Sequence, residues 1–343
     1  MSETTLTYEE LTALIAEIFR KAGMKASPAA AMAGVIAAGE RDGAKSHGIY
    51  RIEGCLRTIK AGKVEAGVLP EILPDDGTAI VRVDGKGGFA PPAFALGAPA
   101  LAERARRLGL AALVINDCTH FSALWHEVET MNALGLTAMA MCPSYATVSP
   151  AGGTSPLLGT NPFAFGWPRV GKPPYVFDFA TSVAARGEIE LHRRAGKPLP
   201  EGWALDKDGQ PTTDPDAALA GSMLPFGGHK GSAIATMIEL LAGIMLGDLT
   251  SQGALDHLGT TTLVPQHGLL VLAFSPDRFA AGRPGNPMDR AEGLFEAILG
   301  QGARLPGQRR FTARAKADRK GILLNEAEMA QLAHLREAGL EVV

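Results

Sequence analysis

An imidazole and a guanidinium stand four residues apart in segment 41–51, which also contains Ser46 and is the densest polar segment of the N-terminal region. On a helix that begins at Ser46, His47 and Arg51 share one face, because residues four apart are neighbours on a helix surface. The pair suits a carboxylate substrate, since arginine binds a carboxylate through two hydrogen bonds while histidine supplies a proton. The alternative is a capped helix start with a solvated histidine and arginine.

Two basic, glycine-containing segments lie late in the chain. Segment 225–231 leads into an apolar helix predicted over 232–246, and its glycines let a ligand approach the backbone beside His229 and Lys230. Segment 304–310 places three arginines in one loop of a slightly acidic chain, as a site for a phosphate monoester requires. A glycine-rich helix entry and a solvated basic loop are the alternatives.

Further polar residues follow the ends of predicted strands. Segment 118–124 joins a strand to a helix whose first turn is open to phosphate, although Ser122 as a helix cap is an equal explanation. Segment 178–182 ends a strand with a carboxylate and two hydroxyls, at the edge where α/β sheets bind ligands. By themselves, segment 159–162 predicts only a turn and Glu188 only a surface acid.

The usual nucleotide and metal motifs are weak or absent. Segment 85–90 fits the pattern G-x-G-x-x-[GA], but Pro91 and Pro92 remove the backbone N–H groups that a pyrophosphate needs, so a Rossmann turn is disfavoured. Segment 228–232 lacks the spacing of a Walker A loop. The eight histidines are scattered, and we expect no metal site.

Hydrophobic spacing predicts helices at both ends of the chain and alternating strands and helices between them. A capping-box pattern at Thr7 and Glu10 starts the first helix. The fold class is therefore α/β, with a helical module from residues 1–76 and 285–343 around a central α/β domain from 77–284. Further helices are predicted over 28–40, 46–62, 92–108, 122–134, 231–246, 290–299 and 326–338, and strands over 79–83, 111–116, 136–142, 175–179 and 269–274.

Composition excludes several classes of protein. The 343 residues are 46% hydrophobic, with a net charge of −3, which argues against a disordered chain and against a nucleic-acid partner. Three widely spaced cysteines predict neither a disulfide framework nor a metal site. No signal peptide or membrane span is expected, so the sequence predicts a cytoplasmic protein.

Taken together and in order, these segments resemble the malate/L-lactate dehydrogenase-like family of nicotinamide oxidoreductases. The resemblance runs from about residue 7 to 335, and its fold is not a Rossmann fold. Within the family the chain is most similar to the Δ1-piperideine-2-carboxylate/Δ1-pyrroline-2-carboxylate reductases. The segments that carry it are Ser46-His47-Gly48-x-x-Arg51, His120-Phe121, Gly159-Thr160-Asn161-Pro162, Asp178-x-Ala180-Thr181-Ser182, Phe226-Gly227-Gly228-His229-Lys230-Gly231-Ser232 and the arginine segment 304–310.

The resemblance implies roles for individual residues. Ser46, His47 and Glu188 would form the proton-delivery group, with His47 as the donor. Substrate would contact four residues, namely Arg51, Thr160, Arg186 and Gly187. The cofactor would contact His120, Phe121, Ser122, Ala123, Leu124, Asp178, Phe179, Ala180, His229, Lys230, Arg304, Leu305, Pro306, Gly307, Gln308, Arg309 and Arg310.

The implied activity is reduction of cyclic imino acids by NADPH: Δ1-piperideine-2-carboxylate to L-pipecolate and Δ1-pyrroline-2-carboxylate to L-proline, in lysine degradation and proline metabolism. The arginine segment favours NADPH over NADH, because the 2′-phosphate is the only charge that distinguishes them. A homodimer is also implied. At two positions the chain departs from these reductases: it has Glu188 where they have Asp and Arg186 where they have His.

Two other functions compete with this one. One is an NAD(P)-dependent 2-hydroxy-acid dehydrogenase of the malate or lactate type, in which position 188 is often Lys. A non-catalytic protein that binds a nucleotide or a small acid in the same cleft would not need His47.

Overall fold

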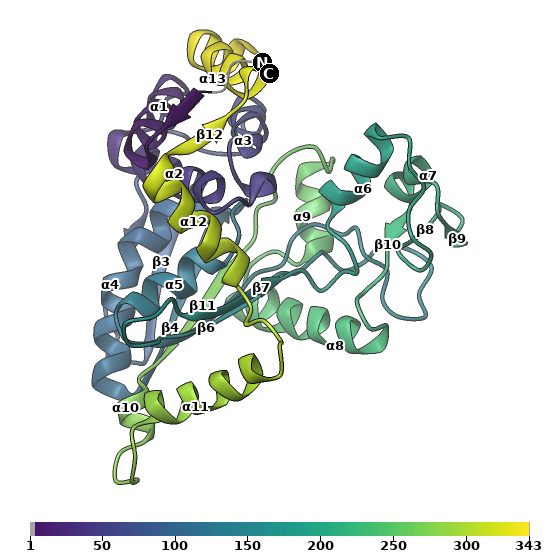
Figure 1. Cartoon of the computed structure of the whole chain (residues 1–343). Coiled ribbons are helices and arrows are strands. Elements are labelled where there is room, and N and C mark those ends of the chain that lie inside the picture. The colour runs from purple at the N-terminus through teal and green to yellow at the C-terminus, as the bar shows by residue number, and fades with distance from the viewer. Residues whose placement is uncertain (1–3, 343) are drawn as a thin grey trace.

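A seven-stranded mixed sheet forms the centre of the molecule in the computed structural model, which describes residues 4–342 (Figure 1). Residues 1–3, within the stretch expected to lack a signal peptide, and residue 343 lie outside this description. Only β3 and β4 run parallel, and every other neighbouring pair in the sheet is antiparallel. The strand order is β2 (Glu71–Ile72), β3 (Ile80–Phe89), β4 (Leu110–Thr119), β11 (Leu269–Phe274), β5 (Thr137–Met141), β6 (Phe163–Trp167) and β7 (Tyr175–Phe179).

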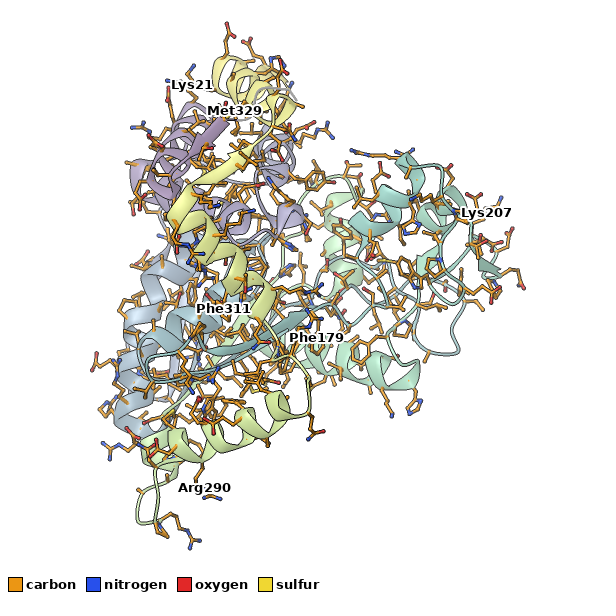
Figure 2. All side chains as sticks on the ribbon, viewed as in Figure 1. Lys21, Phe179, Lys207, Arg290, Phe311 and Met329 are labelled. Carbon is orange, nitrogen blue, oxygen red and sulfur yellow. The ribbon has the colours of Figure 1, made fainter. Side chains whose placement is uncertain are left out.

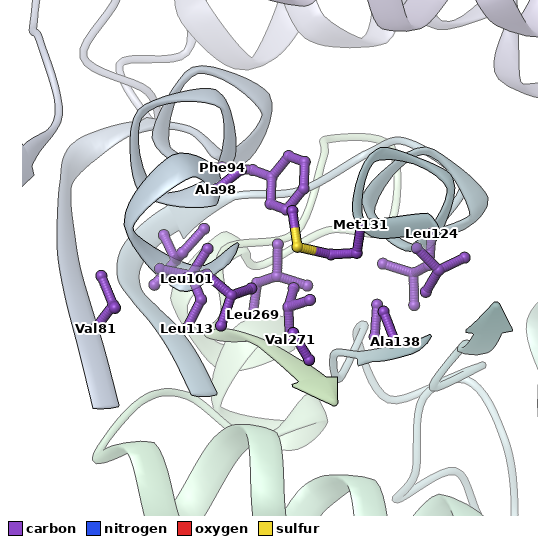
Figure 3. Packing of buried hydrophobic residues seen from close by; sticks show 14 of the residues in the cluster. Val81, Phe94, Ala98, Leu101, Leu113, Leu124, Met131, Ala138, Leu269 and Val271 are labelled. Atoms are coloured by element: carbon purple, nitrogen blue, oxygen red, sulfur yellow. The ribbon is translucent and has the colours of Figure 1, made fainter. Parts of the chain in front are cut away.

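Helices cover both faces of this sheet. On one face, α4 (Ala90–Leu108) and α5 (Trp125–Ala133) bury a large apolar cluster against the central strands (Figure 3). On the other face, α8 (His229–Ile238) packs with a smaller cluster that includes Met141 and Leu270. Strands buried on both faces explain the continuous apolar runs in the sequence.

The two ends of the chain form one helical layer above the sheet (Figure 1). Strand β1 (Thr4–Leu6) pairs with β12 (Ile322–Leu324), which ties the termini together. The capping box predicted at Thr7 is present and starts the first helix. The layer contains α1 (Tyr8–Lys21), α2 (Ala26–Arg41), η1 (Lys45–His47), α3 (Tyr50–Lys60), α12 (Gln308–Lys320), α13 (Glu326–Ala338) and η4 (Gly339–Val342).

Helix α11 (Pro287–Gly300) lies on the outer strands of the sheet instead of on α1–α3. Its Phe295 ring stacks on Tyr175 of β7 at 5.1 Å, and its Glu292 pairs with Arg169 at 2.6 Å. The short α10 (Pro276–Phe279) precedes it. The domain boundaries at 76/77 and 284/285 stay a prediction.

A small third unit projects from the far side of the sheet, at the right in Figure 1, and has a buried apolar cluster of its own. The sequence did not predict it, because its strands are only two residues long and show no periodicity. Its elements are β8 (Ala204–Leu205), β9 (Pro211–Thr212), β10 (Ser222–Met223), α6 (Arg186–Arg194) and α7 (Pro215–Ala220), with α9 (Ser251–Leu258) beside them.

The predicted α/β class is confirmed, and strands 175–179 and 269–274 have the predicted bounds. The predicted apolar helix over 231–246 was wrong as one element: α8 ends at Ile238 and continues as a π-helical turn, Glu239–Gly243, and a 3₁₀ turn, η3 (Ile244–Leu246). The Glu239 carboxylate is buried there, where it accepts hydrogen bonds from Asn161 Nδ2 (2.8 Å) and Ser251 N (2.9 Å).

The glycine segment 85–90 is no Rossmann turn. Its residues 85–89 lie within β3, whose pairing with β4 shifts register between Asp84 and Gly88. Helix α4 then begins at Ala90 with prolines in its first turn. The glycines are needed because a side chain at Gly85 would collide with the backbone of β4, where the Asp117 carbonyl oxygen lies 2.7 Å from the Cβ position.

Candidate functional site

Separated segments of the chain meet at the end of β7. Thr181, two residues beyond this strand, donates to the Thr160 carbonyl oxygen from its backbone nitrogen (2.8 Å) and its hydroxyl (3.0 Å). The Phe226 nitrogen donates to the Thr181 carbonyl oxygen at 3.0 Å. Figure 2 labels Phe179 at the end of β7 and Phe311 on the neighbouring helix α12. The structure therefore brings the predicted segments 159–162, 178–182 and 225–231 together.

Segment 45–49 is seated directly on the last turn of α2. The buried Glu40 carboxylate accepts from Ile49 N at 2.9 Å and pairs with Lys45 Nζ at 2.6 Å. Gly39 permits this approach, because a Cβ there would lie 2.5 Å from the His47 carbonyl oxygen. The predicted helix start at Ser46 was wrong: η1 ends at His47, the chain turns at Gly48, and α3 begins only at Tyr50. His47 and Arg51 therefore do not share a face of one helix.

His47 contacts a serine and a tryptophan. Its Nδ1 lies 3.0 Å from Ser46 Oγ, and its ring meets the Trp125 indole edge-on at 5.9 Å between centroids. Burial, together with the charges of Arg51 and His120, lowers the pKa of His47 to about 3. In the substrate-free protein the imidazole is therefore neutral near pH 7, with Nδ1 directed to Ser46.

The guanidinium groups of Arg51 and Arg186, from different elements, both act on the half-buried phenol of Tyr145. Arg51 is anchored through Nε to the Ser46 carbonyl oxygen at 2.7 Å. Arg186 donates from Nη2 to Thr261 Oγ1 at 3.3 Å, and Tyr145 donates to the Thr261 carbonyl oxygen at 3.1 Å. Burial raises the pKa of Tyr145, while the charges of Arg186 and Arg51 partly offset this effect. Two cations close to one phenol form a setting suited to a carboxylate.

Glu188 stands apart from Ser46 and His47. Its side chain is exposed in the first turn of α6, next to the exposed Gly187. In the described part of the chain, no hydrogen bond or ion pair joins it to either residue. The structure thus brings together two of the three residues expected in the proton-delivery group.

Segment 120–124 is buried beneath the site. His120 Nε2 lies 3.4 Å from Ser122 Oγ and 3.5 Å from Glu127 Oε1. Leu124 belongs to the apolar cluster beneath α4 and α5, and Phe121 belongs to the apolar cluster of the helical layer. Ala123 is also buried.

The first turn of α5 is occupied by protein groups. Helix α5 begins at Trp125 and not at Ser122, and Asp178 Oδ2 accepts from the Trp125 nitrogen at 3.0 Å. The pKa of Asp178 is raised to about 6, because burial and the nearby Glu127 outweigh the Trp125 N–H and the Arg310 charge, which lower it. The expectation that this helix start is open to a phosphate was wrong.

The first turn of α8, in contrast, is open. It has no side-chain cap and no acidic residue, and it presents the exposed side chains of His229 and Lys230. Gly228 before it has a φ of 60° and no heavy atom within 4 Å of its Cβ position. Cations at a helix N-terminus are unfavourable alone, so the arrangement is suited to an anion.

The arginine segment 304–310 divides into two kinds of residue. Gln308, Arg309 and Arg310 belong to helix α12, so the prediction of one loop was wrong. Arg310 is held in ion pairs with Asp42 and Glu129. Arg304 and Arg309 are exposed, and neither makes an ion pair with any residue that the structure describes. Leu305 is buried, and Pro306 and Gly307 are half-buried beside β7.

Sequence reasoning missed Trp125 and Tyr145. Trp125 could have been found from its position directly after segment 120–124, because tryptophan occurs only three times in the sequence. Tyr145 follows β5 by four residues without any motif around it.

A metal site and a membrane-spanning helix have little support in residues 4–342. No group of three or more His, Cys, Asp or Glu side chains there is arranged to hold a metal ion. No single helix there is long and apolar enough to cross a membrane, although the bent pair His229–Leu246 and Ser251–Leu258 reaches the necessary length and composition.

The raised pKa of Asp178 predicts a stability effect. Between about pH 4 and 6 the folded protein retains a proton that the unfolded chain has lost, so this group costs stability as the pH rises. Asp178→Asn should therefore raise the free energy of unfolding at pH 7.5 by about 1–3 kcal/mol. Urea unfolding at pH 4 and 7.5 measures this gain, with the exposed Asp208→Asn as control. A loss of stability at pH 7.5 would contradict the assignment.

Comparison with known proteins places the chain in a family. The sequence model of the malate/L-lactate dehydrogenase family matches residues 6–333. The chain is 70% identical over 340 residues to a Δ1-pyrroline-2-carboxylate reductase of Agrobacterium fabrum, covering 99% of each sequence. It is 52% identical over 332 residues to a Δ1-pyrroline-2-carboxylate/Δ1-piperideine-2-carboxylate reductase of Pseudomonas aeruginosa, covering 97% of this chain and 99% of that one.

A solved structure agrees with this result. The Δ1-piperideine-2-carboxylate reductase from Pseudomonas syringae pv. tomato superimposes with a TM-score of 0.92 at 40% identity, over 97% of this chain and 99% of that chain. The resemblance inferred from the order of the motifs is confirmed: this chain belongs to the malate/L-lactate dehydrogenase family of oxidoreductases.

Proposed function

We propose that this protein reduces the cyclic imino acids Δ1-pyrroline-2-carboxylate and Δ1-piperideine-2-carboxylate to L-proline and L-pipecolate, with NADPH. The observation that carries the proposal is the seating of His47, Ser46 and Arg51 on one rigid segment, where an imidazole and a carboxylate-binding guanidinium are anchored together. Relatives at 70% and 52% identity bear the names of such reductases.

The residues fit a phosphorylated dinucleotide. The open first turn of α8 with His229 and Lys230 suits a pyrophosphate, and the unpaired Arg304 and Arg309 suit the 2′-phosphate. The backbone around Asp178 and Ala180, at the end of β7, would line the space between them. When bound, the reduced nicotinamide supplies the hydride for C2 of the substrate.

Four residues would hold the substrate. Arg51 has both terminal nitrogens free of protein partners in the described chain and would bind the carboxylate. Arg186 offers a second cation, and Gly187 leaves open space beside it. Thr160 is clamped at its carbonyl oxygen by Thr181, while its hydroxyl makes no hydrogen bond within residues 4–342, so it can contact a ligand.

His47 would deliver the proton to the imine nitrogen, and substrate binding would prepare it to do so. The Arg51 charge is one cause of its low pKa. A substrate carboxylate bound to Arg51 cancels that charge and therefore raises the pKa of His47 towards neutrality. Ser46 fixes the orientation of the ring through Nδ1, which leaves Nε2 for the substrate. Glu188, in the first turn of α6, stays in the proposal as the third member of the proton-delivery group, although it makes no hydrogen bond or ion pair to His47 within residues 4–342.

The substrate proposal is tested with a panel of cyclic imines and oxo-acids against both cofactors, measured as loss of reduced-nicotinamide absorbance. We expect turnover of the two imines with NADPH and little with pyruvate or oxaloacetate. His47→Asn should lower kcat about 10²–10⁴-fold, since it removes the general acid. Oxo-acid turnover without imine turnover would assign the chain to 2-hydroxy-acid dehydrogenation. Cofactor binding without any turnover would indicate a non-catalytic binding protein.

Cofactor preference is tested at Arg304 and Arg309. Replacing both with Met should raise the Kd for NADPH at least about tenfold, because charge-assisted hydrogen bonds to phosphate are lost, and leave that for NADH nearly unchanged. Titration of nicotinamide fluorescence measures both constants. Arg319→Met, at the exposed far end of the same helix, serves as the control. Equal weakening of both cofactors would argue against a 2′-phosphate site here.

The proposal includes a homodimer. It also includes a cytoplasmic location, where the cofactor is kept in its reduced form, NADPH, and where the three buried thiols stay free. An apolar strip on the outer side of α8 and η3 supports self-association: Leu240, Ile244 and Met245 are 51%, 59% and 61% exposed. Of the strip, Leu240 also lines a shallow groove of about 530 Å³, together with Met237 and Leu241.

The dimer proposal predicts that charge in this strip separates the subunits. Leu240→Glu with Ile244→Glu should convert a dimer into a monomer in sedimentation-velocity experiments, because buried apolar contacts would be replaced by desolvated carboxylates. Leu323→Glu, at a 50% exposed position on β12, is the matched control. A dimer that survives the double substitution would place the interface elsewhere.

A further inference from the structure

Arg310 is surrounded by carboxylates and aromatic rings. Its Nη1 pairs with Asp42 Oδ2 at 3.2 Å and also with the Glu129 carboxylate. Arg314, one turn later on α12, binds the same two acids, from Nε to Asp42 Oδ1 at 2.8 Å and from Nη2 to Glu129 Oε2 at 2.8 Å. The side chain of Asp42 is fully buried and that of Arg310 is 13% exposed. A guanidinium committed in this way has little left for a cofactor phosphate.

The same guanidinium lies over the ring of Trp125. Its central carbon is 4.7 Å from the Trp125 centroid and 4.8 Å from that of Phe311. The Trp125 indole in turn meets the His47 ring edge-on at 5.9 Å. Arg310, Trp125 and His47 thus form a continuous row of contacts from α12 across the first turn of α5 to the catalytic segment.

Asp42 links this row to His47 by a second route. It is the C-terminal cap of α2 and precedes His47 by only five residues. Burial raises the pKa of Asp42, but its hydrogen bonds and charge contacts with Arg314 and its other arginine partners, Arg41 and Arg310, lower it by more, so it remains charged. The network therefore holds α2, α5 and α12 in one arrangement around the tryptophan.

We propose that Arg310 is a positioning residue for the proton donor: clamped by Asp42 and Glu129, it fixes the Trp125 indole, and the indole fixes the His47 ring. Arginine is required because it can form ion pairs at its edge while its flat face stacks on a ring, and lysine offers only a point charge. The proposal rests on the proposed function for the role of His47, and it separates Arg310 from its neighbours Arg304 and Arg309.

The first experiment does not depend on turnover. In protein labelled with ¹³C-histidine, the His47 Cε1–H signal is assigned by its loss in His47→Asn. We expect this signal to shift in Arg310→Lys, which keeps the charge but loses the stacking face, and to stay unchanged in Arg319→Met. The signal of the remote His257 should stay unchanged in both. A His47 signal in Arg310→Lys that superimposes on the wild type would overturn the proposal, whatever substrate the protein uses.

The second experiment uses steady-state kinetics with both cofactors. Arg310→Met should lower kcat about 10- to 100-fold, as expected when a reacting group is misplaced, and leave the ratio of KM for NADPH to KM for NADH unchanged. Trp125→Leu should produce a similar loss of kcat. The double variant Trp125→Leu/Arg310→Met should have the same kcat as Trp125→Leu alone but a lower melting temperature. A selective rise in KM for NADPH, or independent effects on kcat, would overturn the proposal. Arg310→Lys covers the case in which Arg310→Met does not fold.

Discussion

The close seating of segment 45–49 on the end of α2 is the constraint on which the rest of the site depends. A buried carboxylate, Glu40, lies at the C-terminal end of a helix, where the helix dipole disfavours it. Two groups of this segment stabilise it, the Ile49 N–H and the Lys45 ammonium. Glycine at position 39 lets the two backbones touch. Ser46, His47 and Arg51 are therefore held in place by the protein itself, which in the proposed mechanism lowers the reorganisation needed for catalysis.

The two helix N-termini nearest the site are used in opposite ways. In α5, Asp178 accepts from the Trp125 nitrogen, so the first turn is occupied and serves to orient the indole. In α8, glycines leave the first turn open, and basic side chains replace the usual cap. A helix N-terminus can stabilise an anion only where no protein carboxylate already accepts hydrogen bonds from its N–H groups. In the proposed mechanism the pyrophosphate therefore binds at α8 and not at α5.

Much of the central domain could be predicted from periodicity, because long buried elements have strong patterns. Strands 175–179 and 269–274 and helix 326–338 have the bounds that the sequence indicates. The small third unit could not be predicted, since strands of two residues have no period. The change from α-helix to π-helical turn after Ile238 was also missed, because it occurs where Asn161 and Ser251 reach Glu239 from distant parts of the chain.

The sequence by itself determined the family, because the order of its motifs can be recognised without coordinates, and it led to the proposal that His47 and Arg51 carry the chemistry. It could not decide which charged groups are free, because that depends on neighbours far away along the chain. Arg309 and Arg310 look equivalent in the sequence, yet only Arg310 meets Asp42, a residue 268 positions earlier. The tertiary structure buries the Arg310 guanidinium between carboxylates and leaves the Arg309 guanidinium in solvent. Only the tertiary structure therefore shows which of the two charges is structural and which is available to a ligand.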